Sequence, residues 1–139
     1  MHPVAIKSTL DSMVILCDTR EQDTPKLRRR LEDMGRPYER AALPSGDYSA
    51  KFILPDGAEY SLADRLCIER KMGLDEICGN YTRGRDRFRR EFERMAEKGG
   101  KLYLIVENAT WENVIAGKYR SRLSPSCLTA SLMAWNARY

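Results

Sequence analysis

The 139-residue sequence lacks several features that define common functional classes. No apolar run approaches the roughly 20 residues that a bilayer crossing needs, and the N-terminus lacks the charged-then-apolar pattern of a signal peptide. No Gly-rich phosphate loop of the form G-x-x-x-x-G-K is present, which argues against a nucleoside triphosphatase. Internal repeats and low-complexity segments are also missing. A membrane partner and ATP-driven chemistry are therefore not expected.

Cysteine and histidine are too few and too scattered for a structural zinc site or a disulfide framework. The four cysteines form no C-x-x-C pair, and the single histidine, His2, is isolated at the start of the chain. Cys17 and Cys67 lie within apolar, strand-like runs, where a free cysteine behaves as a small hydrophobic residue. We therefore expect a reducing cytosol and no bound zinc.

Composition is ordinary, whereas the distribution of charge is not. Hydrophobic residues make up 42% and charged residues 32%, which favours one globular domain with one core over disorder. The formal net charge of +4 is modest, but residues 83–94 alone carry six arginines. Positive charge at that density suits a polyanionic partner.

Hydrophobic patterning and turn residues predict a single α/β domain that follows a loosely held lead-in over residues 1–12. The order of strand, helix, three strands, helices, strand and helices predicts a mixed sheet flanked by helices. No stop signal follows the last helix, so we expect the natural chain to continue past residue 139. Strands are expected over 13–17, 38–43, 48–54, 59–69 and 101–107, and helices over 25–34, 74–78, 83–98, 110–115 and from 125 onward.

Acidic residues lie at or just after the ends of predicted strands and bends. Asp18 and Glu21 come after the first apolar run, Asp47 follows a Pro-Ser-Gly bend, and Glu69 precedes Lys71. Hard divalent cations such as Mg²⁺ prefer carboxylate oxygens, so acids on adjacent strands can form a metal site. A lysine beside such a site can orient a water molecule or stabilise phosphoryl charge. The set therefore predicts metal-dependent cleavage of a phosphodiester.

The strand that carries Glu69 brings two of these groups to one face. Side chains alternate along a strand, so Glu69 and Lys71 point the same way and Arg70 points the opposite way. Any one of the acids alone is more often a solvated charge at a strand end. Four acids beside apolar strands, together with a lysine, favour a site. An α/β protein that handles some other phosphate compound is a further hypothesis.

The complete pattern resembles a known family. Gly46-Asp47-x(21)-Glu69-Arg70-Lys71-x(3)-Asp75 is similar to the motif of the XPF-type structure-specific endonucleases of DNA repair and their archaeal and phage relatives. These proteins belong to the restriction-endonuclease-like superfamily, and the resemblance implies a mixed β-sheet flanked by α-helices over residues 13–139. Three further matches lie at Asp18-x-Arg20-Glu21, at Arg87-Phe88 and at Leu104–Glu107.

The resemblance implies a role for each residue of the motif. Asp47 and Glu69 are expected to be the main ligands of Mg²⁺ or Mn²⁺, with Asp18 binding directly or through water. Lys71 is expected to position the attacking water. Asp75 opens a short helix, where an anionic group favours the helix N-terminus, so we expect it to cap that helix or pair with a basic side chain. The expected catalytic set is Asp18, Glu21, Asp47, Glu69, Arg70 and Lys71.

The arginine-rich segment predicts a DNA-phosphate contact. On a helix, Arg83, Arg87, Arg90 and Arg94 form one stripe, and the apolar residues of the segment lie on the opposite side. Such a stripe can be an ordinary solvated face, partly neutralised by neighbouring glutamates. Four arginines in one line also suit phosphate contacts, which add salt-dependent affinity without sequence readout. We favour the phosphate contact.

Two functions follow from the sequence. The first is a Mg²⁺- or Mn²⁺-dependent endonuclease that cuts branched, flapped or forked DNA during repair or recombination. The alternative is a non-catalytic DNA-binding or scaffold subunit of a nuclease complex. The resemblance also implies a homodimer or a nuclease-family partner, in the cytoplasm of a prokaryote or a phage host, or in the nucleus of a eukaryote. Many family members also carry a helix-hairpin-helix module or a helicase, and neither pattern occurs in these 139 residues.

Overall fold

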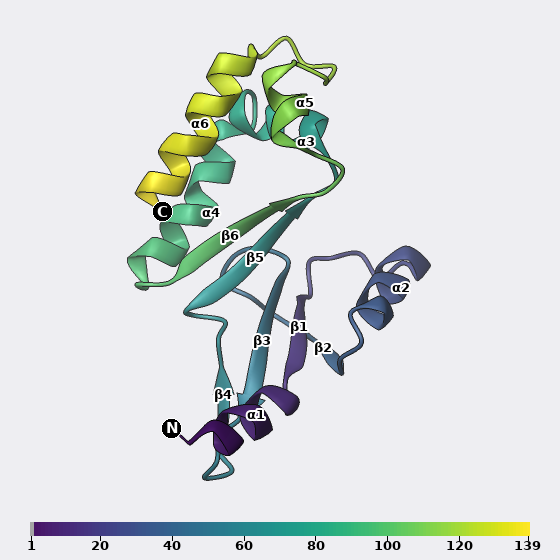
Figure 1. The fold of residues 1–139 in the computed structure, drawn as a ribbon, viewed down its shortest axis with the longest axis vertical. Coiled ribbons are helices and arrows are strands. Elements are labelled where there is room, and N and C mark those ends of the chain that lie inside the picture. Colours follow the sequence, from purple (N-terminus) through teal and green to yellow (C-terminus); the bar gives the residue numbers. More distant parts are fainter. Residues whose placement is uncertain (1) are drawn as a thin grey trace.

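The computed structural model describes residues 2–139 and contains one mixed sheet of six strands (Figure 1). The strand order is β2-β1-β3-β5-β6, and β4 pairs with β3 outside this path. The β1–β2 and β5–β6 pairs are parallel, whereas β3 pairs antiparallel with β1, β4 and β5. The predicted mixed sheet flanked by helices is confirmed. The strands are Val14–Asp18 (β1), Tyr38–Ala41 (β2), Tyr48–Ile53 (β3), Glu59–Ser61 (β4), Leu66–Lys71 (β5) and Lys101–Val106 (β6).

Helices cover both faces of the sheet (Figure 1). Helix α2 packs on one face through a small cluster that includes Leu27, Leu31 and Tyr48. Helices α3 to α6 pack on the other face, where the larger cluster includes Phe88 and Trp135. No helix among residues 2–139 has the length and apolar character that a bilayer crossing requires. The helices are Pro3–Asp11 (α1), Pro25–Asp33 (α2), Leu74–Tyr81 (α3), Arg85–Glu97 (α4), Trp111–Ile115 (α5) and Pro125–Arg138 (α6).

Three helices begin at a side chain that caps the first turn. The side chains of Thr24, Thr110 and Ser124 each accept a hydrogen bond from a backbone N–H of the first helical turn. A proline follows Thr24 and Ser124 at the first helical position, where its missing N–H costs nothing. The starts of α2, α5 and α6 are therefore determined locally.

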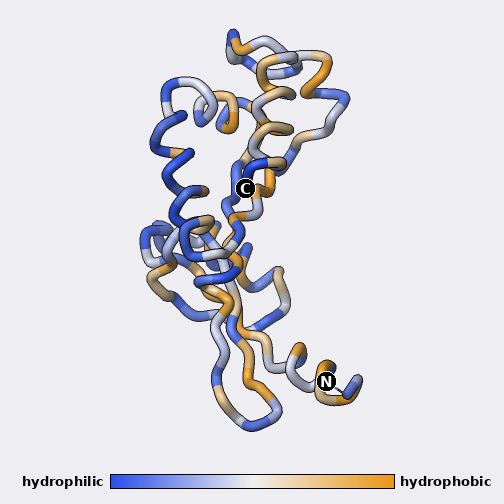
Figure 2. The backbone as a smooth tube through the Cα atoms, turned by 90° about the vertical axis from the view of Figure 1, so that its left-hand side faces the viewer, coloured by the Kyte–Doolittle hydropathy of each residue, from blue (hydrophilic) through white to orange (hydrophobic). Residues whose placement is uncertain are grey.

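Two predicted segments differ from the structure. The single strand expected over 59–69 is two strands, because the backbone turns at Leu62, whose carbonyl accepts hydrogen bonds from the N–H groups of Arg65 and Leu66. The expected lead-in contains helix α1, which lies beside β3 and is joined to it by the Ser12 hydroxyl, an acceptor for the Ile53 N–H at 2.8 Å. Figure 2 shows apolar residues along α1, yet none of them is buried. Helix α1 therefore adds little to the core.

Candidate active site

The Gly46-Asp47 bend lies tightly between β1 and β5. Gly46 has a φ of +73°, and a Cβ at this position would lie 2.7 Å from the Ile68 carbonyl oxygen. The Asp47 N–H donates to that same oxygen at 2.8 Å, and the Asp47 carbonyl accepts from the Asp18 N–H at 2.9 Å. Only glycine combines this backbone conformation with so close an approach. The bend therefore places the Asp47 side chain at the ends of both strands.

The alternation predicted for β5 is confirmed. Cys67, Glu69 and Lys71 are buried on the face that α4 covers, and Arg70 points to the other face. The Lys71 Nζ atom lies 2.5 Å from Glu69 Oε1 and 5.2 Å from the centroid of the Phe88 ring. Both charged side chains are nearly inaccessible, at 6% and 8% exposed. Burial of this kind is uncommon for Glu and Lys unless they are paired.

A cavity of about 180 Å³ opens beside Asp18, Asp47 and Glu69, near the ends of β1 and β5. Burial, and after it the negative charge of Asp47, raises the pKa of Glu69 to about 7, against the opposing effect of Lys71. Burial and a hydrogen bond with Asp47 raise the pKa of Glu21 to about 7. Carboxylates that share a site disfavour each other's ionised form. The cavity is lined by Asp18, Arg20, Glu21, Gly46, Asp47, Glu69 and Glu91.

Asp18 has an environment different from that expected of a metal ligand. Its Oδ1 accepts hydrogen bonds from the Arg20 backbone N–H and Nε, and its Oδ2 accepts from Arg20 Nη2 and the Leu43 N–H. Burial raises the pKa of Asp18, but these hydrogen bonds outweigh it and hold the pKa below the usual range. The side chain is only 2% exposed. Asp18 therefore joins the end of β1 to Arg20 and to the loop after β2.

The Arg70 side chain lies outside this cavity. On the α2 face of the sheet it donates to both carboxylate oxygens of Glu107, at 2.6 and 2.5 Å. Its backbone N–H is the part that reaches the site, because it donates to Asp47 Oδ2 at 2.7 Å. Arg70 therefore orders two acidic residues, Glu107 with its side chain and Asp47 with its main chain.

The predicted arginine stripe is only partly present. Helix α4 begins at Arg85, so Arg83 lies in the preceding turn and its predicted place on the helix is wrong. Arg94 Nε donates to the Pro44 carbonyl and to Ser45 Oγ, so it ties α4 to the bend before Asp47. Arg87 and Arg90 are exposed on α4 and have no ion-pair partner within residues 2–139. On the helix itself, they remain the members of the stripe that are free to meet a phosphate.

Asp75 belongs to the motif but does not line the cavity, whereas Glu91 lines the cavity but does not belong to the motif. Asp75, in the first turn of α3, accepts a hydrogen bond from the Arg120 backbone N–H at 2.7 Å, and its Oδ2 lies 4.0 Å from Arg120 Nε, which is the pairing with a basic side chain that was one of its two predicted roles. Glu91 lines the cavity although the motif does not include it, and its carbonyl accepts from the buried Ser45 hydroxyl at 2.9 Å. Its only signal in the sequence is its place on α4 beside the buried Phe92.

Residues 17–139 match the family model described as the ERCC4 domain. The chain belongs to the ERCC4-domain family. The fold of this ERCC4 domain is similar to that of XPF from Aeropyrum pernix, with a TM-score of 0.61 and 25% sequence identity over 91% of this chain and 49% of that chain. The ERCC4 domain thus spans about half the length of that XPF chain. No curated protein sequence matches it. The predicted XPF-type family and fold class are confirmed.

The donor set of the ERCC4 domain suits a hard divalent cation. Within residues 2–139 no three His, Cys, Asp or Glu side chains are already gathered as a metal cluster. Glu21, Asp47 and Glu69 nevertheless line one cavity, and two of them have a raised pKa through crowding and burial. A bound cation relieves such repulsion, and carboxylate oxygens are the ligands that Mg²⁺ and Mn²⁺ prefer.

Proposed function

We propose that this ERCC4 domain is a divalent-metal-dependent endodeoxyribonuclease that hydrolyses phosphodiester bonds in branched, flapped or forked DNA. The observation that carries the proposal is the convergence of Glu21, Asp47 and Glu69 on one cavity, where Glu69 accepts a hydrogen bond from Lys71. Membership of the ERCC4-domain family supports a nuclease function. A cavity lined mainly by carboxylates repels a phosphate, so a bound cation is needed for the scissile phosphate to enter the cavity itself.

Asp47, Glu69 and Glu21 are the residues that we propose hold Mg²⁺ or Mn²⁺. When bound, the cation activates water and neutralises charge that develops on the phosphate. Asp18 was predicted as a third ligand from the sequence. We instead assign it a positioning role, because its hydrogen bonds to Arg20 and Leu43 occupy both carboxylate oxygens.

Lys71 places a buried positive charge beside Glu69, at 2.5 Å. Its ammonium group has three donors, and one of them meets Glu69 while the Phe88 ring lies beneath it. A buried ammonium held in place in this way can donate to a water molecule or a phosphate oxygen without reorganising. We propose that Lys71 positions the attacking water and stabilises the charge that forms in the transition state.

Removal of divalent metal is expected to abolish cleavage completely. We expect wild-type protein to cut 5′-labelled forked and flapped DNA in Mn²⁺ or Mg²⁺, to cut duplex DNA of the same length more slowly, and to cut nothing in EDTA. Denaturing gels give the cleavage rates, and fluorescence anisotropy in EDTA gives the affinity for each DNA. Binding of forked DNA without cleavage in either metal would favour the non-catalytic subunit instead.

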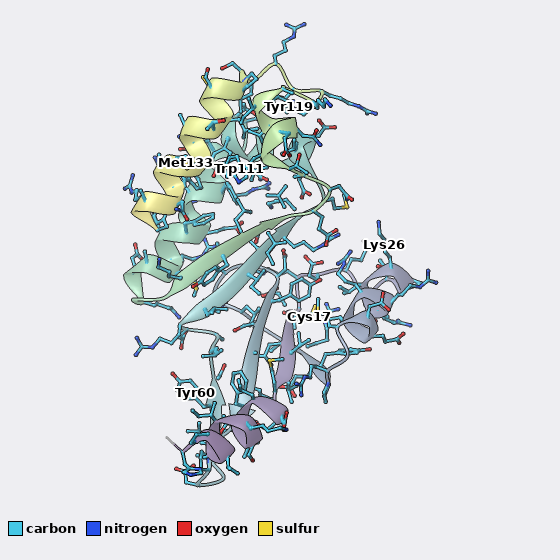
Figure 3. All side chains as sticks on the ribbon, viewed as in Figure 1. Cys17, Lys26, Tyr60, Trp111, Tyr119 and Met133 are labelled. Atoms are coloured by element: carbon cyan, nitrogen blue, oxygen red, sulfur yellow. The ribbon has the colours of Figure 1, made fainter. Side chains whose placement is uncertain are left out.

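A second surface of the domain suits a protein partner. An apolar cavity of about 580 Å³ lies between β6, α5 and α6. Trp111 and Met133 line it and lie close together in Figure 3, and they are 52% and 53% exposed. Exposed aromatic and methionine side chains around a hollow are typical of protein interfaces. We propose that a second copy of this chain, or another nuclease-family domain, pairs through this face.

The substitution Met133→Glu is expected to weaken self-association at least about tenfold, because it places a charge in the centre of an apolar contact. Sedimentation equilibrium over a range of protein concentrations gives the dissociation constant. The matched control is Met34→Glu, which changes a methionine that is 40% exposed at the end of α2, away from this face. A wild-type chain that stays monomeric at every concentration would contradict the homodimer.

A further inference from the structure

Helix α2 has two flanks with different basic residues. Leu27 and Leu31 are buried against the sheet, and a helix turns by about 100° per residue. Lys26 and Arg30 therefore lie together on one flank, four residues apart, while Arg28 lies on the other flank and Arg29 on the outer side. The flanks are both basic, but they differ in the residues that surround their side chains.

The flank with Lys26 and Arg30 is next to the candidate active site. Arg30 Nη1 donates to the Tyr48 hydroxyl at 3.0 Å, and Tyr48 directly follows Asp47 in the chain. The pKa of Glu107 is lowered mainly by its hydrogen bonds from Arg70, and the charges of Arg30 and Lys26 lower it further. These two cations therefore lie along the same edge of the sheet as the acidic cavity, on the face opposite α4.

The charges on this flank are not neutralised. Within residues 2–139, Lys26 and Arg30 have no carboxylate within ion-pair distance, whereas Arg28 makes a two-point contact with Asp23 at 2.8 and 2.9 Å. Lys26 is exposed, and Figure 3 shows it on α2, on the opposite side of the sheet from Trp111 and Met133. Arg30 is half-buried, and its contact with Tyr48 fixes the guanidinium before any ligand arrives.

We propose that Lys26 and Arg30 form a second phosphate-binding surface, which holds the DNA backbone on the α2 side of the active site. Arg87 and Arg90 hold it on the α4 side, so the DNA crosses the edge of the sheet between two basic helices. An acidic cavity needs such flanking cations because its carboxylates repel the phosphates on both sides of the scissile bond. The inference rests on the proposed function and adds to it the path of the DNA.

The test compares two double substitutions on one helix. Lys26→Gln with Arg30→Gln removes the proposed surface, and Arg28→Gln with Arg29→Gln removes the same charge from the other sides of α2. Binding of a 5′-labelled forked DNA is measured by fluorescence anisotropy in EDTA over a series of salt concentrations. The affinity falls as salt rises, and each lost phosphate contact makes the plot of log affinity against log salt less steep by about 1. We expect the steepness to decrease by about 2 for the first pair and to change little for the control pair.

Two further variants separate binding from folding. Tyr48→Phe breaks the hydrogen bond to Arg30 but keeps its charge, so we expect the salt slope to stay unchanged. Lys26→Gln alone changes an exposed side chain and is expected to lower the slope by about 1 without altering thermal unfolding. Equal changes of the salt slope in the two double substitutions would overturn the proposal that Lys26 and Arg30 form a phosphate-binding surface. Wild-type protein that binds no DNA would overturn the proposed function itself, and this result does not depend on the comparison of the two double substitutions.

Discussion

Replacing Asp47 with asparagine is expected to lower the Mn²⁺-dependent cleavage rate by at least about 10³-fold, because it removes a charged metal ligand from the centre of the site. The asparagine oxygen can still accept the hydrogen bond that the Arg70 N–H donates to Asp47 at 2.7 Å, so the bend is expected to keep its shape. The affinity for forked DNA should be unchanged or slightly higher, since a negative charge facing the phosphates is lost. Cleavage rates come from denaturing gels, and Mn²⁺ affinity comes from the electron paramagnetic resonance signal of free Mn²⁺.

Asp75→Asn is the matched control for this prediction. It makes the same chemical change at the last acid of the motif, but Asp75 contacts Arg120 and does not line the cavity. We expect this variant to cleave within a few-fold of the wild-type rate and to bind Mn²⁺ normally. A wild-type cleavage rate for Asp47→Asn would remove Asp47 from the chemistry, and equal losses in both variants would mean that the motif acts only through folding.

The parts of the site that follow from local rules could be predicted from the sequence. A strand alternates its side chains, so the common face of Glu69 and Lys71 follows from their spacing alone. The glycine before Asp47 marks a close approach of two backbones, because a side chain does not fit there. The short distance between Asp47 and β5 is a consequence of that approach. These features depend on a few neighbouring residues and on no other part of the fold.

The parts that depend on distant segments could not be predicted. Asp18 is enclosed because Leu43, twenty-five residues later, donates its N–H to the carboxylate, and no local pattern encodes that contact. Glu91 enters the cavity because α4 docks against the Pro44–Gly46 bend, where Arg94 and the Ser45 hydroxyl fix its rotation. The prediction that Arg83 lies on the helix was wrong for a smaller reason, because the ends of helices are uncertain by one or two residues. That shift is enough to take a side chain out of a helical stripe.

Lys71→Met is expected to abolish detectable cleavage and also to lower the free energy of unfolding by about 2–4 kcal/mol. The loss of stability arises because Glu69, at 6% exposed, would remain buried beside Asp47 without its partner at 2.5 Å. Methionine fills most of the volume of the lysine stem and can keep the contact with Phe88, so packing should change little. Urea denaturation followed by circular dichroism measures the stability, and the forked-DNA assay measures the rate.

The double variant Lys71→Met with Glu69→Met separates the two effects. A buried ion pair that is replaced by apolar side chains of similar size is often neutral for stability, so we expect the double variant to recover most of what the single variant loses. Its cleavage should remain undetectable, because both the proposed ligand and the proposed water-positioning group are gone. If the double variant were as unstable as the single one, the loss would come from packing around Phe88 and not from an unpaired Glu69. If Lys71→Met cleaved DNA at the wild-type rate, the buried pair would be an element of the fold and Lys71 would have no part in the chemistry.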